Sequence, residues 1–124
     1  MTINLPNTQT LLLEQHEHAL YITLNRPKVK NAMSLEMVNE LMTVFKDIEA
    51  NETIRAVVLR GADACFCAGG DIKDMAGARA ALSKSADTTE DPFFALNRAF
   101  GQMISYANQI PQVLIVITEG VVLG

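Results

Sequence analysis

The stretch Cys67-Ala68-Gly69-Gly70-Asp71-Ile72-Lys73 places a pair of glycines directly before a segment whose pattern predicts a helix. Acidic residues come early in that segment and alanines follow, as is typical of a helix N-terminus. The first N–H groups of a helix have no partner inside it, and glycines carry no side chain that would keep a ligand away. The stretch can therefore bind a developing oxyanion, although a glycine pair that only permits a tight turn has the same pattern.

The residues before this stretch predict a hairpin, a helix and a further strand. Residues 10–15 and 20–25 predict two strands, because the second alternates apolar and polar side chains and a polar stretch separates the two. Ser34 is a candidate N-cap for a helix that ends near Asn51 and carries apolar residues at helical spacing. Residues 56–60 then predict a short buried strand followed by a turn.

The residues after the glycine pair predict a loop, a long helix and a strand. Residues 77–91 are rich in Ala, Ser, Thr, Lys and Asp, which favours a surface loop or a short mobile helix. A second long helix is expected to start after Pro92, with one apolar face, and residues 113–118 predict a fully apolar strand. Strands that alternate with helices indicate an α/β fold with a largely buried sheet.

The composition argues against several classes of protein. With 49% hydrophobic residues and no low-complexity tract, the 124 residues predict one globular domain or a part of one. A net charge of −4 argues against nucleic acid as a partner. No apolar run approaches the ~20 residues that cross a bilayer, and the N-terminus lacks the features of a signal peptide. A cytoplasmic protein with no membrane partner is therefore expected.

The cysteines and histidines do not predict a metal site. Cys65 and Cys67 would face opposite ways in an extended segment, and Cys-x-Cys without further ligands is a weak zinc signal. His16 and His18 flank a glutamate on the predicted hairpin turn and would also point to opposite sides. We therefore expect free thiols, a surface turn and no metal.

Residues 66–75 closely resemble the signature of the crotonase superfamily, the enoyl-CoA hydratases and isomerases. Four other stretches resemble family elements in the same order, namely residues 25–27 with 31–34, residues 56–61, residues 111–113 and residues 119–124. The resemblance implies an α/β fold of the crotonase type, a spiral of ββα units. Residues 1–124 would be the N-terminal part of a single domain, truncated at Gly124, with the C-terminal part and its helical region absent. The full-length protein is expected to form a homotrimer or hexamer.

The resemblance also implies a site for an acyl-CoA substrate. In the family, two backbone N–H groups polarise the thioester carbonyl and stabilise an enolate-like intermediate. By position, Gly70 supplies the first, while the second donor and the acid/base carboxylates lie beyond Gly124. Neither Glu119 nor Asp71 is expected to transfer protons. The residues implied in binding coenzyme A are Lys30, Ala68, Gly70, Asp71, Ile72 and Lys73, with Lys28 a weaker candidate and Arg26 expected in a structural role. No separate cofactor is implied, because coenzyme A is part of the substrate.

Residues 11–14, 60–63, 70–79 and 96–101 most resemble the family members that hydrate isohexenylglutaconyl-CoA in acyclic terpene degradation. The resemblance therefore implies an enzyme that adds water across the double bond of this enoyl-CoA. A general short-chain or methylglutaconyl-type enoyl-CoA hydratase or isomerase stays open as an alternative, as does a non-catalytic crotonase-like fragment. The 124-residue piece alone is expected to be inactive and, because the apolar residues 113–118 lack a cover, poorly soluble.

Overall fold

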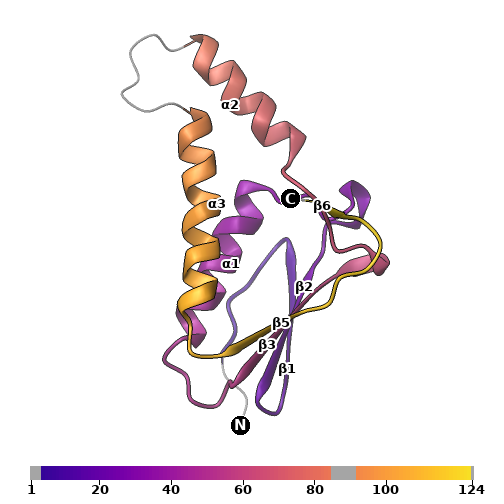
Figure 1. Ribbon diagram of the computed structural model, residues 1–124, viewed down its shortest axis with the longest axis vertical. Helices are drawn as coiled ribbons and strands as arrows, with labels where there is room; N and C mark the ends of the chain where they lie inside the picture. Colours follow the sequence, from indigo (N-terminus) through magenta and orange to yellow (C-terminus); the bar gives the residue numbers. More distant parts are fainter. Residues whose placement is uncertain (1–3, 85–91, 124) are drawn as a thin grey trace.

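The computed structural model describes residues 4–84 and 92–123 and contains a four-stranded sheet. Its strands are β1 (Leu11–His16), β2 (Ala19–Leu24), β3 (Ala56–Gly61) and β5 (Val113–Val116), in the order β1-β2-β3-β5. β1 and β2 form the predicted antiparallel hairpin, while β3 is parallel to both β2 and β5. The predicted α/β arrangement is confirmed (Figure 1).

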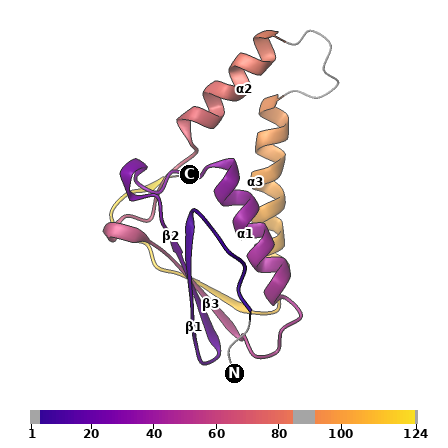
Figure 2. The same ribbon diagram turned by 180° about the vertical axis from the view of Figure 1, so that it is seen from behind.

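Helix α1 (Leu35–Ile48) packs its apolar face on the sheet, and α3 (Pro92–Gln109) lies beside it (Figure 2). The predicted cap is confirmed, since Ser34 Oγ accepts a hydrogen bond from the N–H of Met37 at 3.1 Å. The helix ends at Ile48, slightly before the predicted end near Asn51. Together, α1 and the inner face of the sheet supply most of the hydrophobic core, whose fully buried members include Leu20, Ile22, Leu24, Met37, Leu41, Val44, Phe45, Ile48 and Val57.

Helix α2 (Ile72–Lys84) begins directly after the glycine pair, as predicted, and extends away from the sheet (Figure 1). It includes residues 77–84, so the helical alternative holds for this part of the segment predicted as a loop or short helix. Its many alanines explain the outcome, because alanine has the highest helix propensity. The rest of the predicted loop, residues 85–91, lies outside the described residues.

The expectation of a largely buried sheet is wrong for its last strand. β5 spans Val113–Val116 rather than residues 113–118, and it is an edge strand. Val113 is 63% exposed, and Ile115 and Val116 are also exposed. An apolar, β-branched sequence predicts a strand but does not say whether both faces are covered.

A second, two-stranded sheet was not predicted. It pairs β4 (Cys67–Ala68) in parallel with β6 (Val122–Leu123). Two short 3-10 helices, Pro27–Val29 and Ala62–Ala64, lie in the connections that lead to α1 and β4. Within residues 4–84 and 92–123, no helix has the length and apolar character that a membrane span requires.

Candidate active site

The glycine pair lies between β4 and the first turn of α2, and both sides of it are bound to Met33. The N–H of Met33 donates to the carbonyl oxygen of Gly69 at 2.7 Å, and the N–H of Asp71 donates to the carbonyl oxygen of Met33 at 3.1 Å. Gly69 has a φ of 99°, a conformation that only glycine adopts without strain. Gly70 is therefore held between two residues that are both fixed to the segment preceding α1.

The N–H of Gly70 is free to bind a ligand. Gly70 is exposed, and nothing in the described part of the chain accepts a hydrogen bond from its N–H. A methyl group at this position would meet the end of Met75 at an ordinary contact distance of 3.7 Å, so the site is not closed by neighbouring backbone. A free N–H at the start of a helix is what an oxyanion donor requires. That Gly70 binds an oxyanion stays a prediction.

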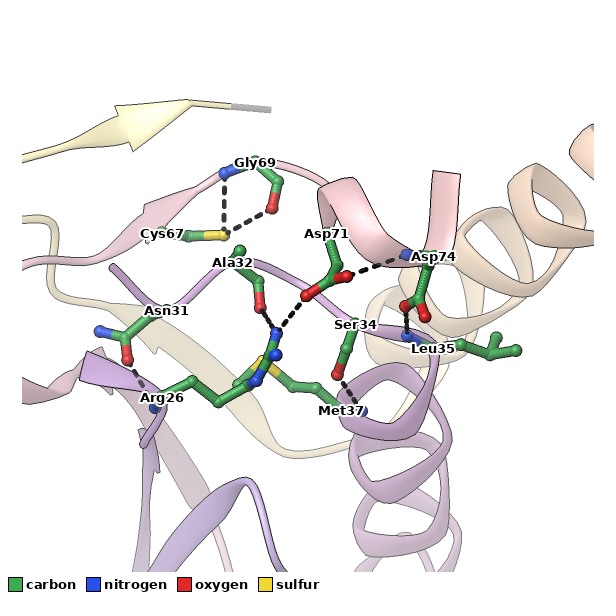
Figure 3. Close-up of polar contacts among 10 residues, drawn as sticks. All are labelled: Arg26, Asn31, Ala32, Ser34, Leu35, Met37, Cys67, Gly69, Asp71 and Asp74. Carbon is green, nitrogen blue, oxygen red and sulfur yellow. Dashed lines mark hydrogen bonds and ion pairs between the residues drawn. The ribbon is translucent and has the colours of Figure 1, made fainter. Parts of the chain in front are cut away.

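Asp71 is buried, and its carboxylate lies between Arg26 and the N–H of Asp74 at the start of α2, which it caps (Figure 3). Oδ1 accepts from the N–H of Asp74 at 2.9 Å, and Oδ2 accepts from Arg26 Nη1 at 2.8 Å. Burial by itself would raise the pKa of this carboxyl, but the hydrogen bonds from Asp74 and Arg26, the charge of Arg26 and a bond from the Lys73 backbone together lower it. Asp71 is thus ionised at neutral pH, which agrees with the expectation that it does not transfer protons.

Arg26 and Asn31 join the loop before α1 to the segment around the glycines. Besides the ion pair with Asp71, Arg26 Nη1 donates to the carbonyl oxygen of Ala32 at 2.7 Å, which confirms its structural role. The N–H of Arg26 donates to Asn31 Oδ1 at 2.8 Å. Asn31 in turn donates to the carbonyl oxygens of Ala62 and Cys65. Two segments far apart in the sequence therefore form one hydrogen-bonded unit.

A cavity of about 680 Å³ lies against this unit, with Gly69 and Gly70 in its wall. The other polar groups from the glycine side are Asp71 and Asp74. The apolar lining includes Met33, Leu41, Phe45, Leu59, Phe66, Phe93, Leu96, Phe100, Met103 and Leu114. An apolar cavity with Gly70 in its wall can bury an apolar chain and bring a carbonyl group close to the backbone of that residue.

The residues predicted to bind coenzyme A come together only in part. Lys30, Ile72 and Lys73 are exposed, and the carbonyl oxygen of Lys30 accepts from the N–H of Ala68 at 3.0 Å. Lys30 and Ala68 are thus neighbours, as a shared site requires. The carboxylate of Asp71 is bound to Arg26, its N–H donates to Met33 and its carbonyl oxygen accepts from the N–H of Met75, so a ligand can meet this residue only through contact and not through a free hydrogen-bonding group. Contact with coenzyme A at each position stays a prediction.

Sequence reasoning missed two parts of the site. Asp74 lines the cavity, and its Oδ2 accepts from the N–H of Leu35 at 2.6 Å, which ties the first turn of α2 to the first turn of α1. Helix α3 supplies much of the cavity wall. The acidic residue in the first turn of a helix and the apolar face of α3 were visible in the sequence, but neither indicates a partner.

The expectations of free thiols and of a surface turn are confirmed. Cys65 and Cys67 are free thiols. His16 and His18 flank the exposed hairpin turn, where His16 Nε2 lies 3.3 Å from Glu14 and His18 Nδ1 lies 2.8 Å from the Thr53 carbonyl oxygen. In the residues that the structure describes, no three His, Cys, Asp or Glu side chains gather at one point.

Comparison with known proteins agrees with this geometry. The family described as "Enoyl-CoA hydratase/isomerase" matches residues 14–123. The chain is 59% identical to an enoyl-CoA hydratase/isomerase from Marinobacter aquaeolei, with a TM-score of 0.83, and 53% identical to AtuE of Pseudomonas aeruginosa, with a TM-score of 0.82. In both cases 90% of this chain is covered, but only 41% of the other.

The curated relatives are also longer than this chain. YngF of Bacillus subtilis is 45% identical over 65 residues, which are 52% of this chain and 25% of that protein. The chain thus spans a quarter of this relative and about two fifths of the two solved structures. A family match over residues 14–123 nevertheless covers nearly all of it, so the chain belongs to the enoyl-CoA hydratase/isomerase family.

Proposed function

We propose that the chain is the N-terminal part of an enoyl-CoA hydratase, a cytoplasmic lyase that adds water across the double bond of isohexenylglutaconyl-CoA in acyclic terpene degradation. The observation that carries the proposal is the free N–H of Gly70 in the wall of an apolar cavity. The thioester oxygen of the substrate accepts this hydrogen bond, and the bond strengthens as negative charge develops on the oxygen. Water then adds at the β-carbon, which the polarised carbonyl has made electrophilic.

The proton-transfer groups and the second N–H donor are assigned to sequence beyond Gly124. Asp71 and Asp74, the carboxylates in the described wall of the cavity, already accept hydrogen bonds from Arg26 and Leu35. A general base needs a free oxygen within reach of the attacking water. Asp71 is buried with both oxygens bound, and half-buried Asp74 is bound through Oδ2 to the backbone of α1, so neither is assigned this role. The greater length of the relatives leaves room for these groups in the complete protein. The complete protein is proposed to be a homotrimer or hexamer.

Coenzyme A is proposed to lie across the start of α2. The backbone of Gly70, Asp71, Ile72 and Lys73 would contact the adenine, and Ala68 lies at the end of β4 beside them. Lys30 is exposed and adjoins Ala68 through a backbone hydrogen bond, so its ammonium group can reach a phosphate without being desolvated.

The acyl group is proposed to enter the apolar cavity. Its volume of about 680 Å³ and its phenylalanine-rich wall suit a branched apolar chain better than a short one. A short-chain or methylglutaconyl-type hydratase would share the Gly70 donor and differ only in the acyl group. An isomerase would share the donor but move the double bond instead of adding water to it.

The test is to read the encoding DNA past codon 124, express the complete reading frame, and follow the loss of the conjugated double bond in isohexenylglutaconyl-CoA, methylglutaconyl-CoA and crotonyl-CoA. A higher kcat/KM for isohexenylglutaconyl-CoA is expected. A preference for crotonyl-CoA or methylglutaconyl-CoA would contradict the proposed substrate but would still support a hydratase. A reading frame that stops after Gly124 and yields a folded protein without activity would favour a non-catalytic member of the family.

A further inference from the structure

The direction of the Gly70 N–H depends on residues other than Gly70. Gly70 is exposed, and its own N–H makes no hydrogen bond within the described chain. Its peptide is flanked by the Gly69 carbonyl, which accepts from Met33, and by the Asp71 N–H, which donates to Met33. Because the Gly70 N–H has no hydrogen bond of its own in the described chain, its orientation is determined by the bonds of the two neighbouring residues. The anchors of Gly69 and Asp71 therefore set the geometry of the donor.

Asp71 has the strongest anchor. Its carboxylate lies 2.8 Å from Arg26 Nη1, and the two side chains are 7% and 23% exposed. Hydrogen bonds between charged groups are stronger than neutral ones, and breaking a buried pair by removing one partner is strongly destabilising locally. The other carboxylate oxygen caps α2 by accepting from Asp74. Rotation of Asp71 would break both contacts together.

Arg26 connects Asp71 to the segment that carries Met33. The same Nη1 atom that meets Asp71 donates to the carbonyl oxygen of Ala32 at 2.7 Å, one residue before Met33 (Figure 3). The ion pair thus clamps the loop that carries Met33 against the residue that follows Gly70, across a separation of 45 residues in the sequence. Met33 holds Gly70 from one side through Gly69 and from the other through Asp71.

From this arrangement we propose that Arg26 and Asp71 are positioning residues for the oxyanion donor, and that their ion pair holds the Gly70 N–H toward the thioester oxygen. The chemistry rests on the proposed function, whereas the positioning is a property of the fold. A misplacement of about 1 Å in an active site can lower the rate roughly 10²-fold. Substrate affinity depends on many other contacts, so loss of the clamp should lower kcat much more than it raises KM.

The experiment compares the complete wild-type protein with Arg26→Met, Asp71→Asn, Arg26→Lys and the double variant R26M/D71N, in steady-state hydration of an enoyl-CoA. R26M is expected to lower kcat by roughly 10- to 100-fold with KM within about twofold, and R26K to recover part of that loss. Since the pair acts as a unit, the double variant should be no slower than the slower single variant.

Arg60→Met is the matched control. Arg60 also forms an ion pair and stacks on an aromatic ring, with its guanidinium 3.9 Å from Glu14 and 4.9 Å from the ring centre of Tyr21. It lies outside the cavity wall, so R60M should keep the wild-type kcat. Unchanged kcat in folded R26M and D71N would overturn the proposal, as would losses that simply add in the double variant. If R26M does not fold, the kcat values of R26K and D71N test the proposal instead.

A second readout separates the positioning from the proposed function. If the wild-type protein hydrates no enoyl-CoA, the proposed function fails, and hydrogen exchange of the peptide covering residues 68–76 then tests the clamp alone. Faster exchange in R26M than in R60M supports the clamp, because the Asp71 and Met75 amides would lose their fixed acceptors. Equal exchange in the two variants would overturn it.

Discussion

The side-chain amide of Asn31 donates a hydrogen bond to the carbonyl oxygen of Cys65 at 2.7 Å and thereby joins two segments 34 residues apart. The same nitrogen donates to the Ala62 carbonyl oxygen at 3.1 Å, and Oδ1 accepts from the N–H of Arg26 at 2.8 Å. Asn31 is fully buried and has a φ of 56°, a left-handed conformation that asparagine tolerates better than most residues. Its side chain and its backbone both hold the loop that precedes α1.

We expect Asn31→Ala to destabilise the protein by about 2–4 kcal/mol, because it leaves the carbonyl oxygens of Ala62 and Cys65 and the N–H of Arg26 without partners and strains the backbone. Urea denaturation at neutral pH measures the loss. Asn31→Gly is the matched comparison, since it removes the same hydrogen bonds but relieves the positive φ. An N31A protein with the wild-type denaturation midpoint would show that water replaces the amide.

Substitutions at Gly70 separate its N–H from its lack of a side chain. Gly70→Ala keeps the N–H, and its Cβ would make only an ordinary contact with Met75 at 3.7 Å. Gly70→Pro removes the donor. In the complete protein we expect G70P to lower kcat by on the order of 10²–10³ while coenzyme A binding is largely kept, and G70A to stay far closer to wild type. Comparable losses of turnover and of binding in G70P would instead indicate misfolding.

The buried carboxylate of Asp71 makes stability depend on pH. Its pKa in the folded protein is below the ordinary value of 3.8, so the unfolded chain binds the proton more tightly. The contribution of this group is therefore complete above its ordinary pKa and is lost as the pH falls through the folded pKa. We expect Asp71→Asn to lose about 1.5–3 kcal/mol at neutral pH.

The difference between wild type and D71N should shrink only in acid, below about pH 4. Urea denaturation of both proteins at a series of pH values measures it. Glu40 also has a lowered pKa, because the hydrogen bonds it accepts from Thr10 and Gln9 outweigh its burial, but it is present in both proteins and cancels in the comparison. A difference that is constant down to the acid transition would contradict ionisation of Asp71 in the folded state.

Local features of the fold could be predicted from the sequence because each rests on neighbouring residues. Ser34 caps α1 through a residue three positions on, and the hairpin of β1 and β2 follows from alternating side chains around a polar turn. The start of α2 after Gly70 follows from the same kind of local signal. The exposure of β5 does not follow from its composition, which indicates a buried strand, and was expected only from the resemblance, which leaves residues 113–118 without a cover.

The arrangement of the candidate site could be predicted only in part. The resemblance indicated Gly70 as the donor, and its N–H has no acceptor among residues 4–84 and 92–123. The backbone bonds of Met33 and the ion pair between Arg26 and Asp71 link residues that are far apart in the chain. Hydrophobic periodicity does not predict a contact between residues far apart in the chain. An Asp at the start of a helix predicts an N-cap but does not identify the cationic side chain that pairs with it.

Gln112 offers a test of how the end of α1 is held. Its Nε2 donates to the carbonyl oxygens of Ile48 at 2.6 Å and Ile54 at 3.2 Å, and the side chain is buried against the end of α1 and the connection to β3. The last carbonyl groups of a helix have no partner inside it, and that of Ile48 also accepts from the N–H of Asn51 at 2.9 Å, so Gln112 matters most for the carbonyl oxygen of Ile54. Gln112→Leu keeps the approximate size but removes the donor, so we expect a loss of about 1–3 kcal/mol in the free energy of unfolding.

Gln109 supplies the control for this substitution. It is exposed at the end of α3, where its Nε2 donates to Ser105 Oγ at 3.3 Å, and Gln109→Leu should change the free energy of unfolding by less than about 0.5 kcal/mol. Urea denaturation midpoints of Q112L and Q109L, measured under the same conditions, test whether the Gln112 hydrogen bonds stabilise the protein. Equal midpoints would mean that the Ile48 carbonyl is satisfied by Asn51 alone and that the Ile54 carbonyl binds water when the amide is removed.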